Sequence, residues 1–372
     1  MNLRRHPVVE EDLKRIASAA LPWGDLAGAT VLITGANGLV AAYLVEALLQ
    51  RNEQEPATAS KVLALVRDRA KAQARFAAYV DRPDLQFIIQ DVCEPLPIRE
   101  PLHYIIHAAS KASPSHFSAN PVGTLLPNVL GTYQLLELAR RRQTRGFLFL
   151  SSGEVYGRFN PPPIQAIAED QFGSLDPLDP RAAYAEAKRA GEALCLAWYR
   201  QYGVPTRIAR LGHTYGPGMD LTDERVFADF VRRIVQGEDI VLKSDGSASR
   251  PFCYLADATE GLLTVLLKGQ GGTAYNLMND EAVVCIKDLA NLLAGLFPER
   301  GVRVILPKPS ERDGSAQWNP GYLVATQRIR QLGWRPSTSV ESGFRRTILT
   351  YTQRASDPEA AHPVLRQGAF SR

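Results

Sequence analysis

The most constraining feature of this sequence is a strand-length apolar run followed by a glycine-rich turn and an amphipathic helix. Residues 29–34 are Ala-Thr-Val-Leu-Ile-Thr, residues 35–38 are Gly-Ala-Asn-Gly, and helical spacing of apolar side chains continues to about Arg51. A short run that is almost entirely apolar suits a strand buried on both faces, as in parallel sheets covered by helices. The unit therefore predicts the strand–turn–helix start of a parallel α/β fold.

Strand-like and helix-like segments continue to alternate after this unit. The expected helices include Asn128–Arg142 and Arg181–Tyr202. The further strands expected in the main sheet are Lys61–Val66, Leu85–Ile89, His103–His107, Gly146–Leu150 and Thr206–Arg210. This alternation predicts the α/β class, with a Rossmann-like, doubly wound parallel sheet.

The glycine turn also predicts a site for a dinucleotide cofactor. Its glycines allow the backbone to approach a pyrophosphate, and the following helix presents N–H groups to the negative charge. Arg67 and Asp68 end the second expected strand and leave NAD and NADP both open, because an acidic residue there suits the ribose of NAD and an arginine suits the extra phosphate of NADP. The expected cofactor-binding residues are Gly35, Asn37, Gly38, Leu39, Arg67, Asp91, Val92, Ala108, Ala109 and Lys188.

The length and composition allow more than one domain. The 372 residues are 45% hydrophobic and 22% charged, which is typical of globular proteins. We expect a helical arm at 1–27, a cofactor-binding domain mainly at 28–211 and a flexible tail at 354–372. Residues 212–353 are expected to form mainly a smaller C-terminal α/β substrate lobe, with some segments returning to the first domain.

Charge and cysteine content argue against several classes of partner. The net charge of +4 is small, and the cluster Arg140–Arg142 ends an expected helix, where cations are favourable, so we expect no nucleic-acid partner. No run approaches the roughly 20 apolar residues that span a bilayer, and residues 1–20 lack a signal-peptide core, so no membrane association is expected. The four cysteines lie far apart without metal spacing, which predicts reduced thiols, no bound metal and a cytoplasmic protein.

A second group of candidate catalytic residues lies after a predicted strand and on a predicted helix. Ser152 and Glu154 follow the apolar run that ends at Leu150, and Tyr184 and Lys188 stand four residues apart on one face of an expected helix. A tyrosine with the ordinary pKa of about 10 is a poor base, but a nearby ammonium and a cationic nicotinamide ring both stabilise its phenolate. Lys188 would supply the ammonium, and Ser152 would hydrogen-bond the same substrate oxygen as Tyr184.

These elements stand in the order found in one enzyme family. The chain resembles the extended short-chain dehydrogenases/reductases that act on nucleotide sugars as epimerases, dehydratases and decarboxylases. The resemblance covers about residues 28–352 and is carried by Thr34-Gly35-Ala36-Asn37-Gly38, His107-Ala108-Ala109, Ser151 to Gly157, Tyr184 with Lys188, Tyr215-Gly216-Pro217, and Arg250 before Phe252. It implies an enzyme with a tightly held, recycled NAD⁺ or NADP⁺ that oxidises the C4 hydroxyl of a nucleotide sugar, with Tyr184 as the base.

The triplet Ser152-Gly153-Glu154 bears on the reaction that follows the 4-keto intermediate. Family members that act at C5 have a glutamate like Glu154, whereas simple 4-epimerases usually have a small or uncharged residue there. Gly153 replaces the aspartic acid with which dehydratases of one type protonate the leaving hydroxyl. We therefore favour a UDP-hexuronate decarboxylase-like reaction with Glu154 as a fourth catalytic residue. A 4,6-dehydratase, a 4-epimerase, a ketone reductase and a non-catalytic dinucleotide-binding protein are the alternatives.

The resemblance also implies the partners. The substrate is a nucleotide-diphosphate sugar, and Arg250 is expected to clamp its pyrophosphate. His213 stands where the decarboxylases usually have an asparagine, so the sugar and the nucleobase stay open. Helices Asn128–Arg142 and Arg181–Tyr202 form a dimer interface in this family, which implies a homodimer through a helix bundle. The implied substrate-binding residues are Ser110, Gly153, His213, Arg225 and Arg250.

Overall fold

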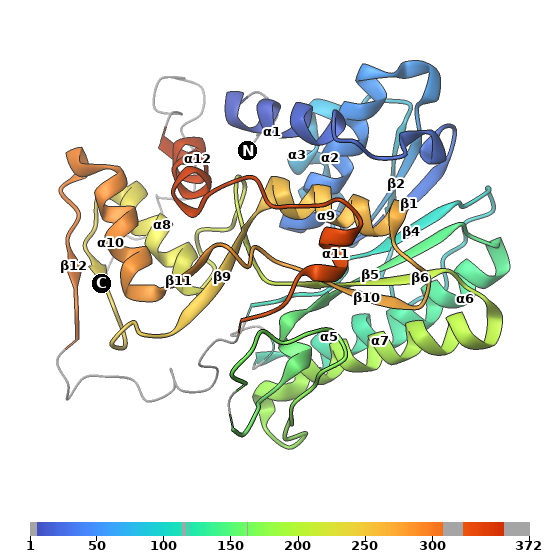
Figure 1. The fold of residues 1–372 in the computed structure, drawn as a ribbon. Coiled ribbons are helices and arrows are strands. Elements are labelled where there is room, and N and C mark those ends of the chain that lie inside the picture. The colour runs from blue at the N-terminus through green and yellow to red at the C-terminus, as the bar shows by residue number, and fades with distance from the viewer. Residues whose placement is uncertain (1–5, 114–116, 118, 162, 308–322, 353–372) are drawn as a thin grey trace, which may run out of the picture.

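A seven-stranded parallel sheet forms the centre of the molecule (Figure 1). The computed structural model describes residues 6–113, 117, 119–161, 163–307 and 323–352, so the tail predicted at 354–372 lies outside the described residues. The strand order is β10-β6-β5-β4-β1-β2-β3, and every neighbouring pair is parallel. The predicted Rossmann-like, doubly wound sheet is confirmed. Its strands are β1 (Thr30–Thr34), β2 (Lys61–Val66), β3 (Leu85–Ile89), β4 (Tyr104–His107), β5 (Gly146–Ser152), β6 (Thr206–Leu211) and β10 (Thr273–Leu277).

Helices cover both faces of this sheet. α2 and α9 pack together on one face, whereas α6 and α7 pack together on the other (Figure 1). Val31 and Ile33 of β1 belong to the core beneath α2, and Leu32 between them belongs to the core beneath α6 and α7. This burial on both faces explains why the strand sequences are continuously apolar. The four helices are α2 (Leu39–Gln54), α6 (Thr132–Arg142), α7 (Ala183–Tyr202) and α9 (Leu255–Lys268).

A smaller α/β lobe lies beside the sheet, on the left of Figure 1. It contains a three-stranded sheet in the order β11-β9-β7 and a two-stranded sheet of β12 and β8. α8, α10 and α12 pack against one another there, whereas α9 and β10 return to the main sheet. The elements of the lobe are β7 (His213–Tyr215), α8 (Val226–Gln236), β8 (Ile240–Val241), β9 (Ser249–Tyr254), β11 (Val283–Cys285), α10 (Ile286–Leu296), β12 (Val304–Ile305) and α12 (Val340–Thr352).

The N-terminal helix α1 (Pro7–Ala17) contacts elements on both sides of the molecule, namely α2, α9 and α12. Its Asp12 is 2% exposed and accepts hydrogen bonds from the hydroxyls of Tyr43 at 3.0 Å and Tyr254 at 2.6 Å. The guanidinium of Arg346 in α12 donates to the same carboxylate at 2.6 Å. The arm therefore joins the main domain to the lobe.

Two elements differ from the sequence expectation. The helix expected at Asn128–Arg142 begins instead with a π-helical turn, Pro127–Gly131, before α6. Pro127 has no backbone N–H and cannot continue regular α-helical hydrogen bonding, so the ladder shifts at this point. The glycine-rich segment 212–218 looks irregular by sequence, but His213–Tyr215 forms β7 because β9 offers a parallel partner.

Short helices complete the described chain. They are α3 (Arg69–Arg75), α5 (Pro121–Leu126) and α11 (Gln327–Gln331), with 3₁₀ turns that include Gly153–Tyr156 and Pro180–Ala182. Among the residues that the structure describes, no helix has both the length and the apolar character needed to cross a bilayer.

Candidate active site

A cavity of about 710 Å³ opens at the carboxyl ends of the central strands and extends to the smaller lobe. The sheet reverses its winding between β1 and β4, because β1 leads into α2 on one face and the chain leaves β4 toward α6 on the other. Open α/β sheets bind ligands at this kind of switch point. Twelve residues of the expected site line the cavity: Gly38, Leu39, Ala108, Ser110, Ser152, Gly153, Glu154, Tyr184, Lys188, His213, Arg225 and Arg250.

Ser152, Tyr184 and Lys188 meet on one wall of this cavity. Ser152 is the last residue of β5, and its hydroxyl accepts the backbone N–H of Glu154 at 3.2 Å, so it caps the following 3₁₀ turn. Tyr184 and Lys188 lie one turn apart on α7, with the Lys188 ammonium 5.8 Å from the centroid of the Tyr184 ring. The strand end and the helix thus bring the three predicted residues together.

The phenol of Tyr184 is held in a buried environment. Burial raises the pKa of Tyr184 to about 12, although a hydrogen bond with Ser152 acts in the opposite direction. The ring of Phe117 stacks on that of Tyr184, with centroids 5.3 Å apart and an interplanar angle of 13°. Sequence reasoning missed Phe117, because a single phenylalanine outside the recognised motifs carries no pattern that points to the cavity.

Lys188 is 3% exposed and donates to the backbone carbonyl of Leu150 at 2.6 Å. Burial lowers the pKa of Lys188 to about 7, and the carboxylate of Glu192, one helical turn further along α7, opposes this shift. The ammonium also lies 4.9 Å from the centroid of the Phe149 ring, a favourable cation–π distance. Lys188 therefore fastens α7 to the end of β5.

Glu154 and Arg250 bring opposite charges into the same cavity. Burial raises the pKa of the Glu154 carboxyl, and the positive charge of Arg250 acts against this rise. Burial also lowers the pKa of the Arg250 guanidinium, with Glu154 opposing. Because Ser152 caps the turn, Glu154 is not required as a helix cap, and its carboxyl can serve the cavity.

His213 and Arg225 line the lobe side of the cavity. Burial lowers the pKa of His213 to about 3, and the charges of Arg250 and Arg225 lower it further, so the imidazole is neutral at physiological pH. The Arg225 guanidinium donates to Asp223 at 2.7 and 2.9 Å and lies 4.9 Å from the Phe227 ring centroid. A neutral imidazole can both donate and accept a hydrogen bond.

The glycine turn has the geometry that a dinucleotide pyrophosphate requires. Gly35 has a φ of +65°, and a Cβ there would lie 2.7 Å from the Cα of Ala109. α2 begins at Leu39 without a side-chain cap on its Gly38 N-cap, and its first turn lines the cavity. The buried Oδ1 of Asn37 has no hydrogen-bond partner among the described residues. The residues present therefore fit a bound dinucleotide, with free N–H groups and a free acceptor.

The remaining expected cofactor residues do not line the cavity. Arg67 and Asp91 face each other at 3.8 Å beyond the ends of β2 and β3, and both are well exposed. Asp68 accepts the backbone N–H of Lys71 at 3.0 Å and is the N-cap of α3. Val92 is 5% exposed and belongs to the core beneath α6.

Comparisons with known proteins extend this description. A model of the NAD dependent epimerase/dehydratase family matches residues 31–278. UDP-glucuronic acid decarboxylase 6 of Arabidopsis thaliana is 31% identical over 314 residues, or 84% of this chain and 86% of that protein. UDP-glucuronic acid decarboxylase 1 of Danio rerio is 32% identical over 323 residues, or 87% of this chain and 72% of that protein.

Solved structures show the same fold at lower identity. An epimerase from Methanothermobacter thermautotrophicus superposes with a TM-score of 0.75 at 20% identity, covering 94% of this chain and 96% of that chain. UDP-glucuronic acid 4-epimerase from Bacillus cereus gives a TM-score of 0.72 at 20% identity, covering 87% and 99%. With the family match and the relatives above 30% identity, the chain belongs to the NAD-dependent epimerase/dehydratase family that its ordered motifs predicted.

Proposed function

We propose that this protein is an NAD-dependent nucleotide-sugar enzyme that works through a 4-keto intermediate and decarboxylates a UDP-hexuronate. The observation that carries the proposal is the convergence of Ser152, Tyr184 and Lys188 with Glu154 and Arg250 in one cavity beside the glycine turn. Relatives that match 84–87% of the chain at 31–32% identity are UDP-glucuronic acid decarboxylases, which supports this reaction over the other family reactions.

The oxidation needs a proton acceptor at the C4 hydroxyl. NAD, when bound, supplies the hydride acceptor for this oxidation and the donor for its reversal. Tyr184 takes the hydroxyl proton, and Ser152, which hydrogen-bonds Tyr184, holds the same substrate oxygen. The ammonium of Lys188, 5.8 Å from the Tyr184 ring, favours the phenolate over the phenol.

Decarboxylation follows from the ketone. Oxidation at C4 turns the C5 carboxylate into a β-keto acid, which loses carbon dioxide readily and leaves an enolate that must be reprotonated. Burial raises the pKa of the Glu154 carboxyl, which suits a group that delivers this proton. Arg225 and Arg250 offer charge-assisted hydrogen bonds to the diphosphate and carboxylate oxygens.

Incubation of the purified protein with UDP-glucuronate tests the reaction. We expect release of carbon dioxide, a product whose mass is lower by one carbon dioxide, and no net consumption of NAD. Loss of water instead would identify a dehydratase, and an isomer of unchanged mass would identify an epimerase. Stoichiometric oxidation or reduction of the cofactor would identify a simple reductase.

The proposal includes NAD rather than NADP as the cofactor. The Arg67 guanidinium, which could meet a 2′-phosphate, is paired with Asp91 at 3.8 Å, and the matching family model is described as NAD dependent. Mass spectrometry of the ligands released from the denatured protein is expected to find NAD. Recovery of NADP would reverse the assignment.

We also propose a homodimer formed through α5, α6 and α7. These helices and the π-helical turn leave a row of large apolar side chains exposed: Val122, Leu126, Val129, Leu130, Tyr133 and Tyr202. An exposed apolar row of this kind suits an interface between two copies related by a twofold axis. Light scattering should give twice the chain mass, and a monomer mass at micromolar concentration would contradict the proposal.

A further inference from the structure

Glu192 lies one helical turn beyond Lys188 on α7 and points toward the end of β5. Its carboxylate accepts a hydrogen bond from the hydroxyl of Ser151 at 2.5 Å. Lys188 donates to the carbonyl of Leu150 at 2.6 Å, so two consecutive residues of β5 are tied to α7. The next residue of the strand is Ser152. These two bonds therefore set the position of Ser152 relative to the helix that carries Tyr184.

Arg210 on the neighbouring strand β6 completes this arrangement. It donates from Nε and Nη2 to the two oxygens of Glu192 at 2.9 and 2.7 Å, and both side chains are only 13% exposed. Its Nη1 donates to the hydroxyl of Tyr156 at 3.1 Å, at the end of the turn that contains Glu154. A bidentate arginine–carboxylate pair is a rigid and directional contact. The pair thus holds both ends of the segment from Ser151 to Tyr156.

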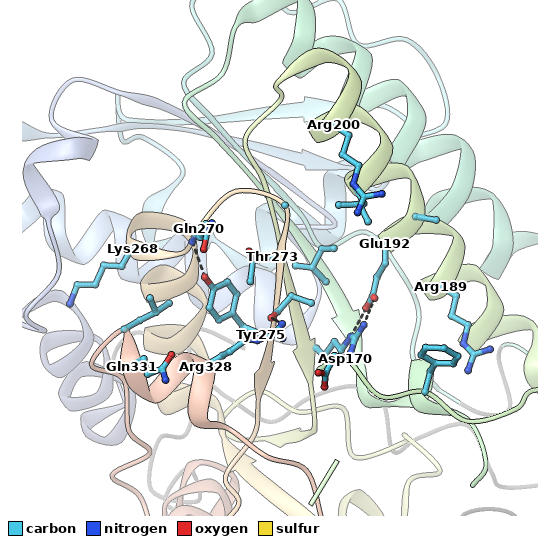
Figure 2. Close-up of a pocket in the computed structure, with 18 residues that line it drawn as sticks. Asp170, Arg189, Glu192, Arg200, Lys268, Gln270, Thr273, Tyr275, Arg328 and Gln331 are labelled. Atoms are coloured by element: carbon cyan, nitrogen blue, oxygen red, sulfur yellow. Dashed lines mark hydrogen bonds and ion pairs between the residues drawn. The ribbon is translucent and has the colours of Figure 1, made fainter. Parts of the chain in front are cut away.

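The pair also borders a groove of about 1160 Å³ between α7, β10 and α11, separate from the cavity that holds Tyr184. Figure 2 shows Glu192 projecting from α7 into this groove, where dashed lines mark its bonds. Glu192 and Arg210 line this groove and do not line the cavity, so substitution of either residue leaves the side chains of the cavity lining unchanged.

We infer that Glu192, held by Arg210, is a positioning residue for the reaction proposed above: it fixes Ser152 against Tyr184 and places a carboxylate one helical turn from the Lys188 ammonium. The inference rests on the proposed function for its effect on turnover, but its effect on Lys188 can be measured without turnover.

The charge of Glu192 matters because Lys188 has few other groups that favour its protonated form. The groups that face it are Tyr184, Glu192 and Cys195 on α7, the Leu150 carbonyl and the Phe149 ring on β5, and His107 on β4. Burial keeps His107 neutral, with a pKa lowered to about 3, and raises the pKa of Cys195 well above its usual range. Among these described groups, Glu192 is the one carboxylate that favours the protonated form of Lys188, so its removal lowers the pKa of Lys188.

The test compares Glu192→Gln with Ser151→Ala and Glu169→Gln in the full chain. Acetylation by acetic anhydride consumes only the neutral amine, so mass spectrometry of the Lys188 peptide across a pH series gives the midpoint of its titration. We expect Glu192→Gln to lower this midpoint by about one pH unit and kcat by about tenfold, with KM changed by less than about twofold. Ser151→Ala should lower kcat but leave the midpoint unchanged, because the carboxylate remains.

Glu169→Gln is the matched control for loss of a buried carboxylate. Glu169 accepts the backbone N–H of Asn276 at 2.9 Å and faces Arg328 at 3.7 Å, away from Lys188. Its backbone carbonyl also accepts from Arg210 Nη1 at 2.9 Å, so the control concerns the charge near Lys188, and we expect its midpoint to match the wild type. An unchanged midpoint and an unchanged kcat in folded Glu192→Gln would overturn the inference.

Two outcomes separate this inference from the proposed function. If the wild type does not act on UDP-glucuronate, the Lys188 midpoint still tests the role of Glu192. If Glu192→Gln does not fold, Glu192→Asp keeps the charge but shortens the reach, so it should preserve the midpoint and lower kcat. Wild-type turnover of Glu192→Asp would then contradict positioning.

Discussion

At the scale of single residues, Tyr184 is the group on which the proposed chemistry depends most directly. Burial raises its pKa to about 12, with the hydrogen bond to Ser152 opposing, so its action as a base depends on nearby positive charge that stabilises the phenolate. We expect Tyr184→Phe to lower kcat by about 100-fold or more while product and substrate still bind, since the ring is retained. Steady-state rates with UDP-glucuronate and binding of UDP measure the two effects. Tyr275→Phe, which loses only a hydroxyl that accepts the N–H of Gln270, is the control.

Glu154 has a pH dependence that follows from its environment. Burial raises the pKa of its carboxyl above the ordinary value of 4.5, with Arg250 opposing. If the protonated form delivers a proton, the rate falls as pH rises through this raised pKa, because the carboxyl then loses its proton. Glu154→Gln should lower the rate about tenfold or more. The fall in rate that accompanies loss of the Glu154 proton should then be absent from the pH–rate profile. A pH–rate profile identical to the wild type would exclude Glu154 as the acid. Glu186→Gln, on the same helix as Tyr184, is the control.

The sequence predicted the residues proposed to act on the substrate, but it did not predict the side chains that contact and position them. Ser152, Tyr184 and Lys188 stand at fixed places in an ordered set of motifs, so the resemblance to the family predicted them as a group, and the structure places them in one cavity. Phe117 could not be found in this way, because it lies outside these motifs and meets Tyr184 only in the folded chain. Glu192 and Arg210 are 18 residues apart, and only the parallel pairing of β5 with β6 places them on either side of Ser151.

At the scale of elements, the close approach of α7 to β5 decides how well the site is held. A Cβ on Gly191 would lie 2.3 Å from Cζ of Phe149, a side chain that is fully buried in β5. We expect Gly191→Ala to destabilise the fold by about 1–3 kcal/mol, even though alanine favours a helix, because α7 must move away from the strand. Urea unfolding measures this change, and kcat should fall with it.

Gly295 on α10 is a glycine at which, unlike Gly191, a Cβ would meet no neighbouring atom. A Cβ there has no heavy atom within 4 Å, and the residue lies inside a regular helix. Gly295→Ala should therefore stabilise the fold by about 0.5–1 kcal/mol and leave kcat unchanged. If both alanine variants shifted stability in the same direction, contact with Phe149 would not be the cause of the first effect.

Strands were easier to predict than the turns between elements. β2 and β3 have the bounds expected from their apolar runs, and in β2 burial of every residue after Lys61 explains the continuous pattern. The π-helical turn Pro127–Gly131 and the strand β7 were not expected, since the first depends on one proline and the second on a partner strand far along the chain. Local propensity does not contain such long-range information.

At the scale of the whole molecule, α1 determines how firmly the two parts of the protein are joined. Asp12 is buried and receives bonds from α2, from the end of β9 and from α12. We expect Asp12→Ala to destabilise the fold by about 3–5 kcal/mol, because it leaves the Arg346 charge without its buried partner. Glu10→Gln on the same helix removes an exposed ion pair with Lys14 at 4.0 Å and should change stability by less than about 1 kcal/mol. Thermal unfolding of both variants measures the difference.

Acid stability is a second property of the whole molecule, and it depends on His107 beneath the cavity. Its Nε2 lies 3.0 Å from the carbonyl of Pro127, which can only accept, and its Nδ1 accepts from the hydroxyl of Thr34 at 2.8 Å. The side chain is neutral and 2% exposed, and burial lowers its pKa from 6.5 to about 3. Because the unfolded chain binds a proton here below about pH 6.5 and the folded chain does not, this residue makes stability fall as pH decreases from about 6.5 toward 3.

The slope of this loss can be measured. We expect one histidine of this kind to contribute about 1.4 kcal/mol per pH unit well below its unfolded pKa, and His107→Gln should remove that slope from urea unfolding curves recorded between about pH 6 and 4.5. His107→Gln also loses stability at pH 7, so the comparison is between slopes rather than absolute values. His103, which directly precedes β4, is only partly buried, so His103→Gln should change the slope less. Equal slopes for the wild type and His107→Gln would show that His107 is protonated in the folded protein, which its contacts with Thr34 and Pro127 oppose.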